Sequence, residues 1–98
     1  MIYEFHPDAE QEFIETAAYY ERNVTGLGER FGREVRHAIE RLLDHPEIGA
    51  PLDASLRRLT LIRFPYVLIY SFSPDVLRVI AVAHTRRRPG YWRSRAKG

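Results

Sequence analysis

Apolar residues in the first half of the chain recur at the spacing of amphipathic helices. The first such stretch follows Pro7, which suits the first turn of a helix, and acidic residues near its start complement the helix dipole. The second follows residues 25–28. The apolar stripes are Ala9, Phe13, Ala17, Tyr20 and Val24, widened by Ile14 and Ala18, and then Phe31, Val35, Ala38, Ile39, Leu42 and Leu43. This spacing predicts two helices.

Turn-forming residues separate the two helices and end the second one. His6 is a candidate cap of the first helix, and Thr25 is expected to cap the second. Pro46 disfavours a helical conformation in the residue before it, so the second helix should end there. Because the link between the helices is short, we predict an antiparallel helix hairpin. Residues 46–56 are predicted to form a loop.

The rest of the pattern changes to the alternation of β-strands. Residues 58–64 alternate, and residues 66–73 are rich in aromatic and β-branched side chains. A Ser-Pro-Asp turn then precedes residues 76–83, whose nearly continuous apolar run is typical of a strand buried on both faces. With residues 2–6 as a short first strand, the element order is β-α-α-β-β-β. We predict a single α+β domain over residues 1–98, with the helix hairpin packed on one face of an antiparallel sheet.

Composition narrows the classes of function. The chain has no cysteine, which excludes disulfides, thiolate zinc sites and cysteine nucleophiles. Nothing resembles a signal peptide, and no apolar run approaches the roughly 18 residues of a membrane helix, so we expect a cytoplasmic protein. The four histidines show no metal-ligand spacing, and no glycine-rich loop joins a strand to a helix. We therefore expect no metal and no cofactor.

Charge is divided unevenly along the chain. Residues 1–53 hold twelve acidic and five basic residues, a net −7, whereas residues 54–98 hold ten basic residues and one acid, a net +9. All but one of those ten are Arg, which binds phosphates and carboxylates through paired hydrogen bonds. Acidic residues of the helices, such as Glu12, Glu15, Glu34 and Glu40, are expected to face solvent. The basic half is thus predicted to bind an anionic partner.

Residues 84–95 combine positive charge with aromatic and imidazole groups, directly after the most buried strand. The adjacent Arg86, Arg87 and Arg88 cannot stabilise a core, so we expect them to act at the surface. His84 is a candidate general base, because the ordinary histidine pKa of about 6.5 lies near neutrality. Tyr91 and Trp92 are candidate stacking platforms for bases. Against that role, the single Trp of a small domain is expected to pack over the sheet.

Three segments in this order resemble the RelE/ParE superfamily of toxins of type II toxin–antitoxin systems. They are residues 64–70 (FPYVLIY), 79–84 (VIAVAH) and 86–92 (RRRPGYW), and residues 6–9 (HPDA) fit the same pattern. The resemblance spans almost the whole chain. It implies a bacterial toxin that arrests growth and is neutralised by a small antitoxin wrapping around it. Given the basic half, we expect an acidic, partly disordered antitoxin and, with it, a toxin–antitoxin hetero-oligomer.

The superfamily contains two activities. Members of the ParE type poison DNA gyrase without obvious catalytic residues, through their sheet and basic C-terminal region. Members of the RelE type cleave mRNA in the ribosomal A site; the resemblance would then assign proton transfer to His84 or Tyr91 and transition-state stabilisation to Arg86. The contacts to target or phosphate would be Arg57, Arg58, Arg63, Arg86, Arg87, Arg88, Trp92 and Arg93.

Three hypotheses follow from these residues. Trp92 stands where many ribonucleases of the RelE type carry a Tyr, and lysines common before the central strands are missing, which favours a ParE-like toxin acting on gyrase. A RelE-like, ribosome-dependent mRNA endonuclease is the alternative. A non-toxic member, or a binding module with another target, is the third.

Overall fold

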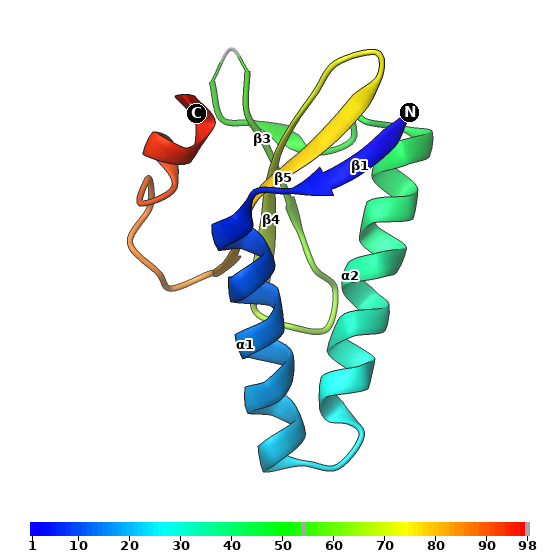
Figure 1. Ribbon diagram of the computed structural model, residues 1–98, viewed down its shortest axis with the longest axis vertical. Coiled ribbons are helices and arrows are strands. Elements are labelled where there is room, and N and C mark those ends of the chain that lie inside the picture. The colour runs from blue at the N-terminus through cyan, green and yellow to red at the C-terminus, as the bar shows by residue number, and fades with distance from the viewer. Residues whose placement is uncertain (54, 98) are drawn as a thin grey trace.

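The computed structural model describes residues 1–53 and 55–97, and it combines two long helices with a mixed sheet (Figure 1). The elements in chain order are β1 (Ile2–Phe5), α1 (Pro7–Asn23), α2 (Leu27–Asp44), β2 (Ala50–Pro51), β3 (Arg57–Thr60), β4 (Tyr66–Phe72), β5 (Val76–His84) and the 3₁₀-helix η1 (Arg93–Lys97). The predicted α+β order is confirmed. The short strand β2 is added within the predicted loop 46–56, which also contains Ala54, outside the described residues.

The sheet has the strand order β1-β5-β4-β3-β2. Neighbouring strands from β2 to β5 are antiparallel. The prediction of a purely antiparallel sheet is wrong, because β1 runs parallel to β5, with Ile2 opposite Val76 and Phe5 opposite Val79. Parallel strands need a long crossover connection, and here the helix hairpin and the other strands lie between β1 and β5 in the chain.

A bulge in β5 changes which side chains face each side of the sheet. Ile69 of β4 pairs with Ala81, whereas Tyr70 pairs with Val79, so Ile80 is an extra residue in β5. One extra residue reverses the alternation of side chains. Val79 therefore faces the helices, while Ile80 and Ala81 both belong to the cluster on the opposite face. The predicted burial of this strand on both sides is confirmed.

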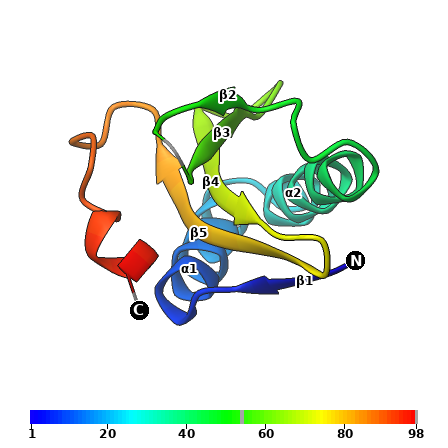
Figure 2. The same cartoon turned by 90° about the horizontal axis from the view of Figure 1, so that it is seen from above.

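Two apolar clusters lie on opposite faces of the sheet. The larger one joins the sheet to α1 and α2 around Phe31, whose ring lies 5.2–5.9 Å from those of Phe13, Phe64 and Tyr66. The smaller one includes Trp92 of the C-terminal segment. Figure 2 shows that segment on the side of the sheet away from α2. The helix hairpin thus covers one face, and the chain's last residues cover part of the other.

The start of α2 is stabilised by a side chain of α1. The N-cap is Gly26 (φ +89°), and the predicted cap at Thr25 is wrong. The carboxylate of Glu21 accepts hydrogen bonds from the backbone N–H of Gly26 (2.8 Å) and of Gly28 (3.0 Å), so donors at the helix start are paired without Thr25. At α1 the candidate cap is confirmed, because His6 Nδ1 accepts from a backbone N–H of the first turn.

The apolar stripe of α1 is narrower than predicted. Only part of it reaches the core, and its remaining members are exposed because they lie on the flank or at the end of the helix. The exposed members are Ile14, Ala18 and Val24.

The strand predicted over residues 58–64 ends at Thr60. Beyond it, the backbone N–H groups of Ile62 and Arg63 donate to the carboxylate of Glu34 on α2. These two N–H groups therefore bind α2 and do not extend the pairing of β3. The alternation itself is confirmed, since Leu61 is buried and Ile62 is exposed.

Gly28 and Gly32 share one face of α2 but differ in the room available for a Cβ atom. At Gly28 a Cβ would meet the backbone oxygen of Ala17 and, at 2.9 Å, the Cβ of Glu21; at Gly32 it would meet the flexible end of Arg36 at 3.3 Å. We expect Gly28→Ala to lower the Tm, since overpacking costs about 1–3 kcal/mol. Gly32→Ala should leave the Tm unchanged or raise it, since Ala is favoured over Gly in helices by up to about 1 kcal/mol. Thermal denaturation followed by circular dichroism compares them, and equal Tm values would contradict this account.

Candidate functional site

The C-terminal segment, residues 85–97, is anchored on α1 by one carboxylate. Glu12 accepts hydrogen bonds from the backbone N–H of Val82 (3.0 Å) and from the phenol of Tyr91 (2.8 Å). Arg95 binds both carboxylate oxygens at 2.9 and 3.0 Å and also donates to the carbonyl of Ile80 (3.1 Å). The side chains of Glu12 and Arg95 are each 13% exposed. The prediction that Glu12 faces solvent is therefore wrong, because it pairs with residues that follow β5.

This anchor changes the acid–base properties of two side chains. Burial, together with the hydrogen bond and negative charge of Glu12, raises the pKa of Tyr91 far above its ordinary value. The hydrogen bond to Glu12 likewise raises the pKa of Arg95. The phenol of Tyr91 stays protonated at neutral pH and donates a hydrogen bond to Glu12. That role competes with the proton transfer that a ribonuclease would need from this residue.

Trp92 packs against the sheet, which confirms that expectation. Its side chain is 7% exposed and belongs to the apolar cluster that also contains Ile69 and Ile80. The ring of Tyr91 meets it edge-on at 5.3 Å. A buried indole offers no face to a base or to a protein target. Trp92 therefore holds the C-terminal segment against the sheet.

Between β5 and Tyr91 the chain carries three arginines on a short loop. Arg86 and Arg88 are exposed. The guanidinium of Arg87 lies over the ring of Tyr91, 3.9 Å from its centroid, in a cation–π contact. Further along, Arg93 forms an exposed ion pair of 3.2 Å with Asp53. Because Tyr91 is itself held by Glu12, the cation–π contact positions the guanidinium of Arg87.

His84 lies at the end of β5, beside a shallow hollow facing α1. It is half-buried, and its ring meets that of Tyr66 edge-on at 5.1 Å. Its Nδ1 accepts a hydrogen bond from the backbone N–H of Arg86 (3.0 Å), which leaves Nε2 as the nitrogen available for chemistry. His84 and Arg87 line the hollow, of about 200 Å³, together with Glu12 and Glu15.

The remaining arginines predicted as contacts lie in three different places. Arg57 donates to the backbone carbonyls of Glu47 (2.9 Å) and Gly49 (2.8 Å), so it holds the chain before β2. Arg58 is exposed on β3. Arg63 lies in the turn between β3 and β4, next to α2. Sequence reasoning grouped these residues with the C-terminal arginines, but the structure distributes them over the surface.

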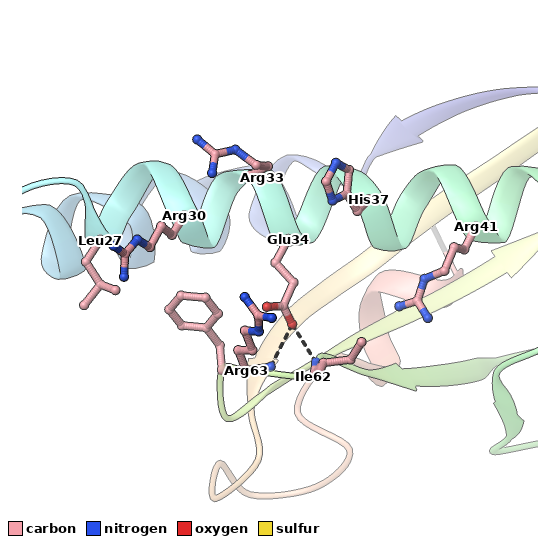
Figure 3. A pocket seen from close by; sticks show the side chains of 9 residues that line it. Leu27, Arg30, Arg33, Glu34, His37, Arg41, Ile62 and Arg63 are labelled. Atoms are coloured by element: carbon pink, nitrogen blue, oxygen red, sulfur yellow. Dashed lines mark hydrogen bonds between the residues drawn. The ribbon is translucent and has the colours of Figure 1, made fainter.

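A second basic surface, which the sequence analysis missed, lies along α2 (Figure 3). It is a groove of about 670 Å³ between α2 and the turn that follows β3. Five of its residues recur every three or four positions on α2, beside the core stripe, and this spacing was the signal available in the sequence. The lining residues are Leu27, Arg30, Arg33, Glu34, His37, Arg41, Ile62, Arg63 and Phe64.

Residues 1–53 and 55–97 contain no group of three His, Asp or Glu side chains placed to hold a metal ion. The same ranges contain no helix whose length and apolar character would let it cross a membrane.

Comparisons with known proteins give matches of two kinds. Residues 3–89 match the family model of the ParE toxin of the type II toxin–antitoxin system, parDE. Among solved structures, a chain of the chromosomal ParDE TA system from P. aeruginosa is similar with a TM-score of 0.60 and 17% identity, over 86% of this chain and 95% of that chain. No curated protein matches the chain. The structural likeness supports the α+β fold described above.

Loss of the anchor should release the C-terminal segment before the rest of the domain unfolds. We expect Glu12→Gln to lower the free energy of unfolding by about 2–3 kcal/mol, somewhat less than for a fully buried pair, because Arg95 loses its counter-charge. Trp92 is the only Trp, so its emission should shift to longer wavelength. The matched control is Glu15→Gln on the exposed side of α1, which should cost no more than about 0.5 kcal/mol. Similar losses in both variants would exclude the proposed anchor.

The raised pKa of Tyr91 predicts a loss of stability at alkaline pH. A group whose pKa is higher in the folded chain stabilises fully below its unfolded pKa, here about 10, and this contribution declines above that pH. We therefore expect the free energy of unfolding to fall more steeply above about pH 10 in the wild type than in Tyr91→Phe. Urea denaturation at a series of pH values measures both slopes. Parallel curves would show that Tyr91 does not carry the effect.

Proposed function

The chain belongs to the ParE family of toxins of type II toxin–antitoxin systems, and from this premise we propose that it arrests growth by binding DNA gyrase. The arginine loop, defined as residues 85–90, is the proposed target-binding surface. In this proposal the protein acts as a cytoplasmic gyrase poison rather than as an enzyme. An acidic antitoxin neutralises it by forming a complex with it.

The observation that carries this proposal is how the arginine loop is held. Tyr91 donates a hydrogen bond to Glu12, and Trp92 is buried, so the two aromatic groups support the loop. Arg86 and Arg88 remain exposed and Arg87 rests on Tyr91. A rigid array of cations with no free acid at Tyr91 is suited to binding an anionic or polar surface.

The surroundings of His84 favour testing the endonuclease alternative as well. His84 is half-exposed, and its hollow also contains Arg87, so a base and a cation lie beside each other. The endonuclease mechanism needs a base such as His84, whereas gyrase binding through the loop does not need the imidazole. His84→Ala therefore separates the two functions.

The proposal is tested by incubating the purified chain with gyrase and relaxed plasmid. We expect inhibited supercoiling and a trapped cleavage complex with the wild type, and at least about tenfold weaker inhibition with Arg86→Ala/Arg88→Ala, since each lost contact costs about 1 kcal/mol. The matched control is Arg22→Ala/Arg36→Ala, which removes the same charge from exposed positions on the helices. Unimpaired supercoiling without a trapped cleavage complex would contradict the gyrase proposal.

The same variants are tested in translating ribosomes by toeprinting. We expect no mRNA cleavage with the wild type, and we expect His84→Ala to arrest growth as the wild type does when expressed from an inducible promoter. Cleavage that disappears in His84→Ala would instead support the endonuclease.

A further inference from the structure

The groove along α2 is built by two elements that are far apart in the sequence. Glu34 of α2 accepts the backbone N–H groups of Ile62 and Arg63, which fixes the turn after β3 opposite the helix (Figure 3). Figure 3 also shows the side chain of Arg63 pointing from this turn toward α2. The groove therefore has two walls that are held together by hydrogen bonds, and both walls contribute positive charge.

Basic side chains recur on each turn of α2 along this groove. They follow one another every three or four residues, about 4.5–6 Å apart along the helix axis, and are Arg30, Arg33, His37 and Arg41. With Arg63 and one carboxylate, the lining has a net charge of +3 when His37 is neutral. Arg33 also pairs with an acidic residue of the same helix, but both side chains are more than half exposed, so this pair is weak. A ligand that matches this wall carries a negative charge on each of its repeats.

This regular spacing favours a nucleic acid over an acidic peptide. Every repeat of a nucleic acid carries a phosphate, whereas a peptide presents charge at such short intervals only where acidic residues recur without a break. All the groove cations that are charged at neutral pH are arginines. The planar guanidinium of Arg forms paired hydrogen bonds to phosphate oxygens, so the residue type and the spacing both suit a phosphate backbone.

The dimensions of the groove favour a single strand. From Leu27 to Arg41 the groove follows α2 for about 21 Å. Its volume of about 670 Å³ over this length gives a mean cross-section of about 30 Å². One extended backbone fits this cross-section. A duplex, whose major groove alone is about 12 Å wide, is too broad to enter between the two walls.

The groove also has apolar surface that bases can contact. Leu27 and Phe64 line it, and Ile62 projects at its edge with 77% of its surface exposed. The ring of Phe64 is contacted edge-on by Tyr20 (5.1 Å) and Phe31 (5.2 Å), so the aliphatic side chains provide most of this surface. Bases gain hydrophobic contact there, whereas a polyanion without bases, such as inorganic polyphosphate, has no apolar group to place on it.

We propose that the groove along α2 binds single-stranded nucleic acid. The phosphates lie between the arginines of α2 and Arg63, and the bases contact Leu27 and Ile62. Because contacts to the backbone dominate, binding depends strongly on salt and little on base sequence.

This activity is separate from the proposed binding of gyrase. α2 packs on one face of the sheet through Phe31 and Val35, whereas Trp92 holds the C-terminal segment against the other face. Figures 1 and 2 both show that segment on the far side of the sheet from α2. A strand in the groove therefore leaves the arginine loop uncovered.

The test measures binding of a fluorescein-labelled oligodeoxythymidine of about eight nucleotides to the full chain by fluorescence anisotropy. The measurement is repeated over a series of salt concentrations. We expect Arg30→Ala/Arg41→Ala to weaken binding by at least about tenfold at low salt. The slope of log K against log salt concentration should decrease in magnitude by about 1.4, since each phosphate contact to a single strand contributes about 0.7. Ile62→Ser should weaken binding by about threefold and leave the slope unchanged, because it removes only an apolar contact.

Two control variants remove the same charge elsewhere. Arg22→Ala/Arg36→Ala changes exposed positions of the helices outside the groove, and Arg86→Ala/Arg88→Ala changes the arginine loop. Each should weaken binding by less than about threefold. Circular dichroism shows whether every variant is folded, and the exposure of Ile62 lets its replacement leave the core intact.

Three outcomes would overturn the proposal. They are equal losses in the groove and control variants, a larger loss in the loop variant than in the groove variant, and competition by polyglutamate or inorganic polyphosphate that equals competition by an unlabelled oligonucleotide of the same charge. The assay contains no gyrase. Groove-dependent binding with failed gyrase inhibition would therefore remove the proposed target and retain the nucleic-acid site, and the reverse result would remove only the nucleic-acid site.

Discussion

The carboxylate of Glu12 occupies the point where α1, the last residues of β5 and the C-terminal segment meet. β1 pairs with β5 only as far as Val79, so the backbone of β5 beyond that residue has no strand beside it on that side. Glu12 accepts the N–H of Val82, and Arg95 donates to the carbonyl of Ile80. Unpaired backbone groups at a sheet edge are costly when shielded and invite other strands when exposed. Here an ion pair completes the edge in place of a strand.

The same ion pair anchors the residues that follow the arginine loop, the surface that we propose to bind the target. The loop is tied to β5 at one end and to Tyr91 at the other, and Trp92 holds the following residues against the sheet. A loop that is already ordered loses less conformational entropy on binding than a free tail does. If the loop binds the target as we propose, the anchor links the stability of this face of the sheet to the affinity of the loop. For that reason a change at Glu12 reaches the loop, although this side chain does not belong to it.

Periodicity alone was sufficient to predict both helices and the three main strands, because their apolar faces follow from local spacing. Residue type was sufficient to predict that Arg86 and Arg88 are exposed and that Trp92 is packed against the sheet. Contacts between residues that are remote in the sequence leave no periodic pattern in it. Glu12 and Arg95 are 83 positions apart, and Glu34 meets the turn after β3 at separations of 28 and 29. From the sequence alone, an acidic residue on a helix is expected to face solvent, because its partner is not known. The parallel pairing of β1 with β5 likewise depends on residues that are remote in the sequence.

Folding rearranges a charge distribution that is strongly divided along the sequence. Acidic residues of the first half neutralise part of the basic half through the pairs Glu12–Arg95, Asp53–Arg93 and Glu4–Arg78. The acidic half also contributes positive charge, because three arginines of α2 line a groove together with Arg63. The result is two basic surfaces on opposite faces of the sheet in place of one basic half. Because the sheet separates these surfaces, a partner bound at one of them does not cover the arginines of the other.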